Sequence, residues 1–176
     1  MCIRDRPFTV HHELEPVYIL GEFGVQAEAA GFSIVPPAAM ALGDWKVQQM
    51  PFFSDRVVYT RHYTLAAVQP AIVRLDKWNG TTAEIRVNGK TAGVMVSPPW
   101  EADITPFVQD GDNTVEVIVY GSLKNVFGPH LGKITRGIVT PWSHRYPPTP
   151  RQQPPGSAYD LDAYGLQTDF TVVTRK

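Results

Sequence analysis

This 176-residue chain lacks an excess of charge of either sign, since it has 16 Lys and Arg against 17 Asp and Glu. A protein that binds nucleic acid needs a basic surface to neutralise phosphates, so the composition argues against that partner. Long apolar runs are also missing, because no stretch approaches the roughly 18 consecutive apolar residues of a membrane helix. The sequence therefore predicts no nucleic-acid partner, no membrane-spanning helix and no membrane partner.

Cysteine is nearly absent, and the one thiol belongs to Cys2. Residues 1–6, MCIRDR, resemble the translated end of a transposase adapter used to prepare sequencing libraries; the other interpretation is a natural basic N-terminus. If the adapter interpretation holds, Cys2 is foreign, and no disulfide, thiolate nucleophile or cysteine metal site can be argued. The reading frame would then have lost its true start, so we expect the chain to be the C-terminal part of a larger protein.

Proline, in contrast, is abundant: its sixteen residues are about twice the usual share of roughly 5%. Frequent proline favours turns and extended segments and disfavours long helices. The rest of the composition is ordinary, with 43% hydrophobic and 19% charged residues. A chain of this length can form one domain that hides roughly 70% of the surface exposed by its unfolded form.

Short alternating or apolar segments, bounded by turn-forming residues, predict β-strands along much of the chain. In residues 57–65, VVYTRHYTL, the odd-numbered positions form an aromatic-rich face. In residues 113–120, NTVEVIVY, the alternating valines share one face and are predicted to point inward. The other predicted strands are residues 17–24, 32–37 and 71–76, and residues 159–173 supply one or two more.

A β-hairpin is predicted at Asn88-Gly89, the strongest short signal for a two-residue type I′ turn. Counting outward from this turn pairs Val87 with Lys90, Ile85 with Ala92, and Ala83 with Val94. The double proline at 98–99 ends the extended segment. Next, Thr105-Pro106 predicts the N-cap and first residue of one short helical turn, with Gly111 as its C-terminal stop.

Residues 121–158 form a long connection that is rich in proline and has little periodicity. In a compact domain a connection of this length is usually functional or partly disordered. Elsewhere the short strands, the turns between them and the near absence of a helical pattern predict an all-β sandwich. Composition and periodicity leave open whether the topology is a jelly roll or immunoglobulin-like.

Two runs carry a family resemblance: LGDWKVQQMPFFSDRVVYTRHYTL at 42–65 and AEIRVNGKTAGVMVSPPWEADITPFVQDGDNTVEVIVYGSLKNVFGPH at 83–130. They resemble the sugar-binding jelly-roll domain of glycoside hydrolase family 2, which has a galactose-binding-domain-like fold. A similar module lies at the C-terminal end of large rhamnosidase-type glycoside hydrolases. The resemblance implies a jelly roll over residues 41–176, with residues 7–40 as the tail of a preceding domain or as first strands. Residues 97–100, SPPW, depart from the family's pattern.

Sugars present C–H faces ringed by hydroxyls, so their sites combine an aromatic ring with planar hydrogen-bonding groups. Loops of this chain offer three such groups of candidate residues: Trp78 with Asn79; Trp100 with Glu101 and Asp103; and Asn125, His130, Trp142, His144 and Tyr146. Each has a structural alternative. Trp45 and Trp78 fit core or edge packing better than ligand contact, as do the two histidines, and Trp142 and Tyr146 could dock their loop. For Trp100 both interpretations stay open.

Catalysis and metal binding are weakly supported by the sequence. Glycosidic cleavage needs two carboxylates roughly 5 to 10 Å apart, but the pairs Glu101 with Asp103 and Asp160 with Asp162 fit exposed charge better. The acidic turn at 110–113 contains hard oxygen ligands that suit calcium, although such a segment is more often only a turn. We predict no catalytic residue, no metal and no cofactor within this chain.

The function predicted from the resemblance is a non-catalytic carbohydrate-binding accessory module at the C-terminal end of a multidomain glycoside hydrolase. Its expected partners are an oligosaccharide or polysaccharide and the catalytic domain of the same parent chain. One alternative is a purely structural sandwich that buttresses the catalytic domain and binds no glycan. Another is a loop residue that completes an active site on that domain. The resemblance also implies an extracytoplasmic location, periplasmic or secreted, in a bacterium.

Overall fold

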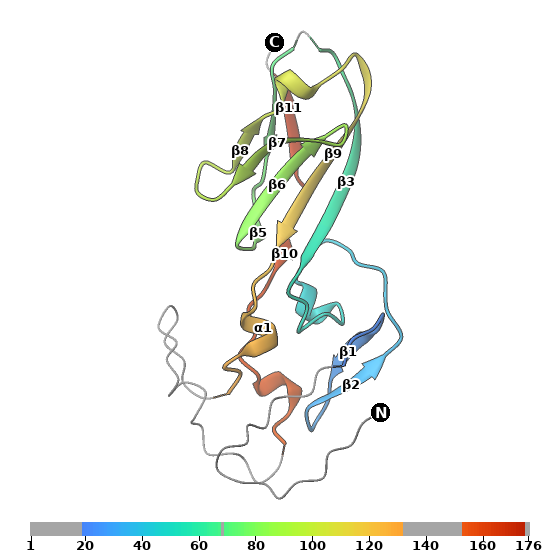
Figure 1. Ribbon diagram of the computed structural model, residues 1–176, viewed down its shortest axis with the longest axis vertical. Helices are drawn as coiled ribbons and strands as arrows, with labels where there is room; N and C mark the ends of the chain where they lie inside the picture. The colour runs from blue at the N-terminus through green and yellow to red at the C-terminus, as the bar shows by residue number, and fades with distance from the viewer. Residues whose placement is uncertain (1–18, 68, 132–152, 175–176) are drawn as a thin grey trace, which may run out of the picture.

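The computed structural model describes residues 19–67, 69–131 and 153–174, and in these ranges nearly all regular structure is β-strand (Figure 1). Two antiparallel sheets form the sandwich. The four-stranded sheet has the order β3 (Arg56–Leu65), β9 (Gly111–Tyr120), β6 (Thr82–Val87), β7 (Lys90–Met95). The three-stranded sheet has the order β11 (Thr171–Thr174), β4 (Ala71–Arg74), β8 (Glu101–Asp103). The predicted all-β sandwich is confirmed.

Two smaller sheets flank the sandwich: β10 (Gly165–Leu166) pairs with β5 (Trp78–Asn79), and β1 (Gly24–Ala27) pairs with β2 (Phe32–Val35). The helical elements are single turns: α1 (Lys124–Phe127) and 3-10 turns at Trp45–Val47, Thr105–Phe107 and Gly156–Ala158. None of the helices in the described part of the chain is long enough or apolar enough to cross a bilayer.

The core lies between the two large sheets, and period-two alternation explains which side chains enter it. In β3 the odd-numbered residues, which form the predicted aromatic-rich face, are the less exposed ones, and Tyr59 is buried. The valines of β9 and the alternate residues of β6 are also buried, as are Ala71 and Val73 of β4. Each fully buried Val or Ile stabilises the fold by roughly 1.5–3 kcal/mol, so these alternating residues hold the sheets together.

The hairpin turn between β6 and β7 is confirmed, because Asn88 and Gly89 have φ values of 51° and 79°. Its predicted register is correct next to the turn, where Val87 pairs with Lys90. Beyond Arg86 the prediction is wrong: Ile85 pairs with Gly93, and Ala83 pairs with Met95. A β-bulge causes the difference, since one extra residue on β7 shifts every later pair by one position.

The segment before the sandwich differs from the predicted strand at 17–24. Residues 19–23 form no strand, and β1 starts only at Gly24, opposite Val35 of β2. Proline at 36 and 37 ends β2 as expected, so a hairpin this short leaves the apolar residues before Gly24 without a partner strand. The C-terminal strands predicted within 159–173 are confirmed as β10 and β11.

The short helical turn predicted near Thr105 is present as a 3-10 turn, but Thr105 is not its cap. Ile104 is in the cap position, and Asp103 Oδ1 accepts hydrogen bonds from both the Thr105 amide and its hydroxyl. The Thr105 hydroxyl oxygen instead accepts from the Ala71 amide at 3.0 Å and so ties this turn to β4. Gly111 is the first residue of β9, with φ of 91°, rather than a helix stop.

Candidate functional site

Two tryptophans from separate loops meet at one edge of the sandwich. Trp78 is in β5, where it pairs with Leu166 of β10, and Trp100 directly precedes β8. Their ring centroids are 4.9 Å apart at an interplanar angle of 88°, an edge-to-face arrangement. Both rings are half-buried and pack against the core. The structure therefore combines Trp78 and Trp100, two separate sequence candidates, into one aromatic pair.

Charged groups lie on the strands next to this pair. Arg74 of β4 and Glu101 of β8 are opposite each other in the sheet, and the Arg74 Nε donates to Glu101 Oε1 at 2.8 Å. Since Glu101 follows Trp100 directly, the position of this ion pair is fixed relative to that ring. The neighbouring Asn79 is exposed and pairs through its backbone with Gly165. A sugar site needs aromatic rings together with planar polar groups, and both kinds of side chain occur in this part of the sandwich.

Asp103 lies at the end of β8, and its carboxylate stabilises the turn that follows this strand. Its carboxylate accepts from the Thr105 hydroxyl at 2.6 Å and from the Thr105 amide at 2.9 Å. Hydrogen bonds to the charged form stabilise it, so these two bonds hold the pKa of Asp103 below its usual value. Asp103 therefore fixes the turn after β8, and Glu101 is ion-paired, so this pair of carboxylates has local structural partners.

Asn125 and His130 belong to a second cluster around α1, and their geometry favours a structural role. Asn125 is 1% exposed. Its Nδ2 donates to the Asp162 carbonyl at 2.9 Å, and its Oδ1 accepts from the Asp162 amide at 2.8 Å. His130 Nε2 lies 2.8 Å from the Asn125 carbonyl, and its ring packs on Phe52 and Tyr159. These contacts join α1 to the C-terminal segment.

The remaining candidates have mixed outcomes. Trp142, His144 and Tyr146 lie outside the described residues, so their predicted role stays a prediction. Trp45 is buried in the core, and its Nε1 donates to the Tyr59 hydroxyl at 2.8 Å, which matches the structural interpretation. Asp160 lies 3.4 Å from Lys124 Nζ in an ion pair.

The acidic turn considered for calcium is hydrogen-bonded to residues at and after the end of β3. Asp110 Oδ1 accepts from the Ala67 amide at 2.8 Å, and Asp112 Oδ1 accepts from the Thr64 hydroxyl at 3.1 Å. Asn113 is buried, and its amide bonds to Gln109 and to neighbouring groups. Across residues 19–67, 69–131 and 153–174, no group of three or more His, Cys, Asp or Glu is arranged to hold a metal ion.

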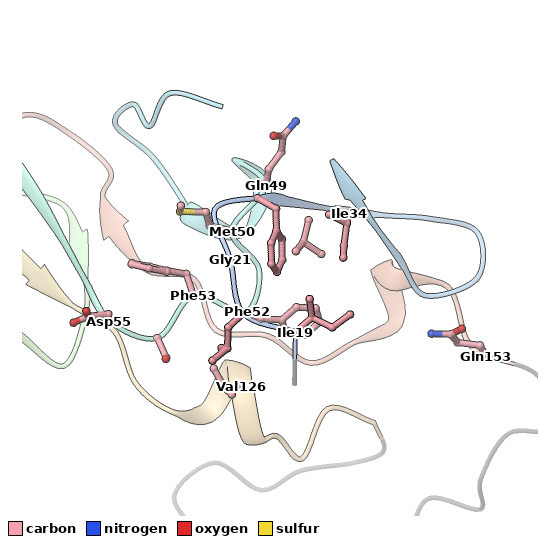
Figure 2. A pocket seen from close by; sticks show the side chains of 14 residues that line it. Ile19, Gly21, Ile34, Gln49, Met50, Phe52, Phe53, Asp55, Val126 and Gln153 are labelled. Atoms are coloured by element: carbon pink, nitrogen blue, oxygen red, sulfur yellow. The ribbon is translucent and has the colours of Figure 1, made fainter. Parts of the chain in front are cut away.

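Sequence reasoning missed an apolar groove of about 760 Å³ at the end of the sandwich where β3 begins (Figure 2). It is lined by residues of the segments 19–25 and 49–55, by Ile34 of β2, by Val126 of α1 and by Gln153. Aromatic and aliphatic side chains dominate, with Phe23, Phe52, Phe53, Met50 and Val126 among them. No local pattern could have indicated it, because the walls are assembled from segments that are distant in the sequence.

The described residues form an all-β sandwich with an aromatic pair at one edge. No family model matches the chain, and no curated protein matches it. Among solved structures, the chain is similar to a rhamnosidase from Novosphingobium sp. PP1Y, with 18% identity and a TM-score of 0.53, over 94% of this chain and 16% of that one. At this identity the likeness shows the fold alone.

Two further solved structures give partial matches. A β-glucuronidase from Bacteroides uniformis is 23% identical over 69% of this chain and 12% of its own, with a TM-score of 0.41. A family 2 β-galacturonidase from Eisenbergiella tayi is 18% identical over 57% of this chain and 17% of its own, with a TM-score of 0.38. TM-scores this low carry no argument about this chain. In each case the chain spans only a small part of the solved protein.

Proposed function

We propose that this chain is a non-catalytic, carbohydrate-binding accessory module of a multidomain glycoside hydrolase, with its ligand site at Trp78 and Trp100. The supporting observation is the match in fold to the rhamnosidase, which includes 94% of this chain but only 16% of that one. A module that occupies so small a share of a glycoside hydrolase is expected to assist catalysis elsewhere in the parent. The predicted domain boundary, with a preceding segment at 7–40 and the module at 41–176, stays a prediction.

The physical case for a sugar ligand rests on the tryptophan pair and its polar neighbours. Because the two rings are perpendicular, a sugar could stack on one ring face but could not be sandwiched between two parallel rings. Stacking of this kind adds about 1 kcal/mol beyond the area that it buries. Asn79 and Glu101 directly follow the two tryptophans in the sequence, and Glu101 is ion-paired with Arg74, so these are the planar polar side chains that the proposal assigns to the site. We therefore expect weak, shallow binding in the millimolar to high micromolar range.

Cleavage by this chain alone is not part of the proposal. The two carboxylate pairs considered from the sequence are held in ion pairs or local hydrogen bonds, as described for Glu101, Asp103 and Asp160. A glycosidase needs one free nucleophile or base and one acid across the scissile bond. The proposal therefore assigns catalysis to another part of the parent. We also propose, from the resemblance, that the parent is exported by a bacterium.

A structural module without glycan binding is the second candidate, and one observation favours it. Trp78 and Trp100 pack against the core and against each other, so both also serve stability. Calorimetric titration of the chain with rhamnose-containing and uronic-acid-containing oligosaccharides separates the two functions. We expect measurable binding that Trp100→Ala weakens at least about fivefold, which corresponds to roughly 1 kcal/mol of lost stacking.

The matched control for this titration is Val94→Ala, since Val94 is exposed on the other large sheet. It should leave the titration unchanged. Circular dichroism must show that Trp100→Ala retains the β-sheet signal, so that loss of binding is separated from loss of fold. If no oligosaccharide gives heat, the module is structural. If Trp100→Ala binds like the unmodified chain, glycan binding stands and the assigned ligand site is wrong.

A further inference from the structure

β3 is an edge strand of the four-stranded sheet, and in Figure 1 it runs along an outer side of the sandwich. Directly before it, the Asp55 carbonyl accepts from the Gly121 amide at 2.9 Å. Backbone groups alternate in an antiparallel ladder, so the odd-numbered residues of β3 bond to β9. The residues whose backbone groups point away from β9 are Val58, Thr60, His62 and Thr64. We call this side of the strand the open edge of β3.

The open edge is long and regular. Its ten residues are nearly twice the usual strand length of roughly 5–6, and the pairing with β9 is continuous from Arg56 to Leu65. No backbone group of the described residues bonds to the open edge. Unpaired amides and carbonyls along such a strand are a template for pairing with another chain. An edge of this kind therefore needs protection.

The other edges of the two large sheets differ from β3 in length or regularity. β8 has three residues and β11 has four, and such short strands are poor templates for pairing. The β6–β7 pairing contains the bulge, which twists an edge away from a regular ladder. β3 is neither short nor bulged, so its protection must have another source.

Arg61 is the charged residue on the inward face of β3. The other residues of that face all contribute to the core or pack against it, and they are Val57, Tyr59, Tyr63 and Leu65. Arg61 Nε donates to Asp169 Oδ2 at 2.8 Å, just before β11, and its Nη1 donates to the Thr60 carbonyl at 2.8 Å. The guanidinium therefore lies at the open edge and occupies one of its carbonyls.

Stability does not explain an arginine at this position. The Arg61 and Asp169 side chains are both 41% exposed, and exposed ion pairs contribute little to the free energy of unfolding. An inward-facing charge on an edge strand does oppose the addition of another strand. The new strand would cover the guanidinium and displace it from the Thr60 carbonyl, and covering an unpaired charge is costly.

We infer that Arg61 shields the open edge of β3, and that without this side chain the edge pairs with β3 of a second copy of this chain. A two-fold axis brings the same edge of two copies together in antiparallel orientation, which closes a dimer. A second copy therefore fits the open edge without any other partner. The inference does not depend on glycan binding.

Sedimentation velocity of the 176-residue chain tests the inference at concentrations from about micromolar to millimolar. The unmodified chain should stay monomeric. Arg61→Val should self-associate at least about tenfold more tightly, since pairing then covers no charge. Arg61→Lys should stay monomeric, because it retains a charge at the inward-facing position. Equal association of the valine and lysine variants would contradict a role for the charge.

Arg74→Val is the matched control. Arg74 donates through Nε to Glu101 at 2.8 Å, and its side chain is 47% exposed, so its ion pair is similar to that of Arg61. However, β4 is the central strand of its sheet. This variant loses an ion pair and gains a valine without unshielding an edge, so it should stay monomeric. Circular dichroism checks that each variant is folded.

Thr60→Pro, added to Arg61→Val, tests where the association occurs. The Thr60 amide points to the open edge, so proline removes a donor that a partner strand needs and none that β9 needs. The double variant should be monomeric. In associated Arg61→Val, amide exchange should slow at Val58, Thr60 and His62 relative to the dilute protein.

Three results would overturn the inference. The first is a folded Arg61→Val that stays monomeric over the whole concentration range. The second is an associated Arg61→Val whose slowed amides lie outside β3. The third is an unmodified chain that already pairs through β3. If Arg61→Val does not fold, Arg61→Thr takes its place with the same expected results, since threonine is also uncharged and β-branched.

Discussion

Glu84 lies on the outward face of the four-stranded sheet and is the centre of a hydrogen-bond network. Its Oε1 accepts from Arg86 Nε at 2.7 Å and from the Thr91 hydroxyl at 2.8 Å. Its Oε2 accepts from the Tyr120 hydroxyl at 2.8 Å. The Arg86 hydrogen bond is the largest cause, followed by that of Thr91, and together the donors lower the pKa of Glu84 to about 2. Three strands are thereby joined at one residue.

This network predicts an acid-dependent loss of stability. The pKa of Glu84 is depressed in the folded chain, so its stabilisation is complete above the ordinary value of 4.5 and is lost as pH falls toward about 2. Urea unfolding between pH 5.5 and pH 2.5, approximate limits set by that window, should show a declining unfolding free energy. Glu84→Gln should flatten the decline, whereas Glu22→Gln, outside the network, should leave it intact. An unaltered pH profile for Glu84→Gln would contradict the assignment.

At the residue scale the sequence indicates which side chains face inward, but not which polar atoms meet. Alternation places Tyr59 on the aromatic-rich face of its strand, and the structure shows that this is the less exposed face of β3. It does not predict that the Tyr59 hydroxyl accepts from Trp45 and from the Leu166 amide, 107 positions away. In the same way, Trp78 and Trp100 are predicted as separate loop residues. Only the pairing of β4 with β8 and of β5 with β10 brings the two rings together.

In the β6–β7 hairpin the turn residues determine the turn, and the geometry of the sheet determines the register of the strands beyond it. The turn is local: Asn88 and Gly89 both need positive φ, and the two residue types permit it. The register past Arg86 cannot be predicted from the turn residues, because it depends on the bulge. A bulge bends its strand and increases the local twist of the sheet. Asn88 also bonds through its side chain to Asn113 and to the Thr114 amide. Those contacts attach the hairpin to the start of β9.

Gly89→Ala tests the turn separately from packing. No atom lies within 4 Å of the position that a Cβ would occupy at Gly89, so any cost comes from its φ of 79°. We expect a loss of about 1–2 kcal/mol in unfolding free energy, measured by urea denaturation. Gly93→Ala is the control in the same hairpin: its φ is ordinary, and the nearest Cβ contact, with Ala102, is 3.6 Å. Equal losses for the two variants would mean that strand packing, not the turn, controls this site.

At the scale of the whole molecule, the β1–β2 hairpin and the sandwich are joined through the C-terminal segment. Gly31 forms a bridge with Pro155, the Gly31 amide donates to the Pro154 carbonyl at 2.8 Å, and the Gly156 amide donates to Glu28 at 2.9 Å. Figure 1 shows this hairpin at the end of the sandwich, beside the segment that follows β2. The sequence predicts a strand at 32–37, which the structure contains as β2 (Phe32–Val35). It does not predict the docking of this strand, since the docking partners are more than 100 residues apart.

Gly156→Ala should loosen this junction without unfolding the sandwich. A Cβ at Gly156 would lie 2.6 Å from the Gly31 carbonyl oxygen and 2.9 Å from the Ala27 Cα, both backbone atoms that cannot rotate away. The hairpin must therefore shift or detach. We expect amide exchange in β1 and β2 to accelerate about tenfold or more, while β3, β6 and β9 retain their protection. The control is Ser157→Ala, an exposed neighbour in the same turn. If the sandwich strands lose protection together with β1 and β2, the two parts form one cooperative unit, and the hairpin is as essential to stability as the core.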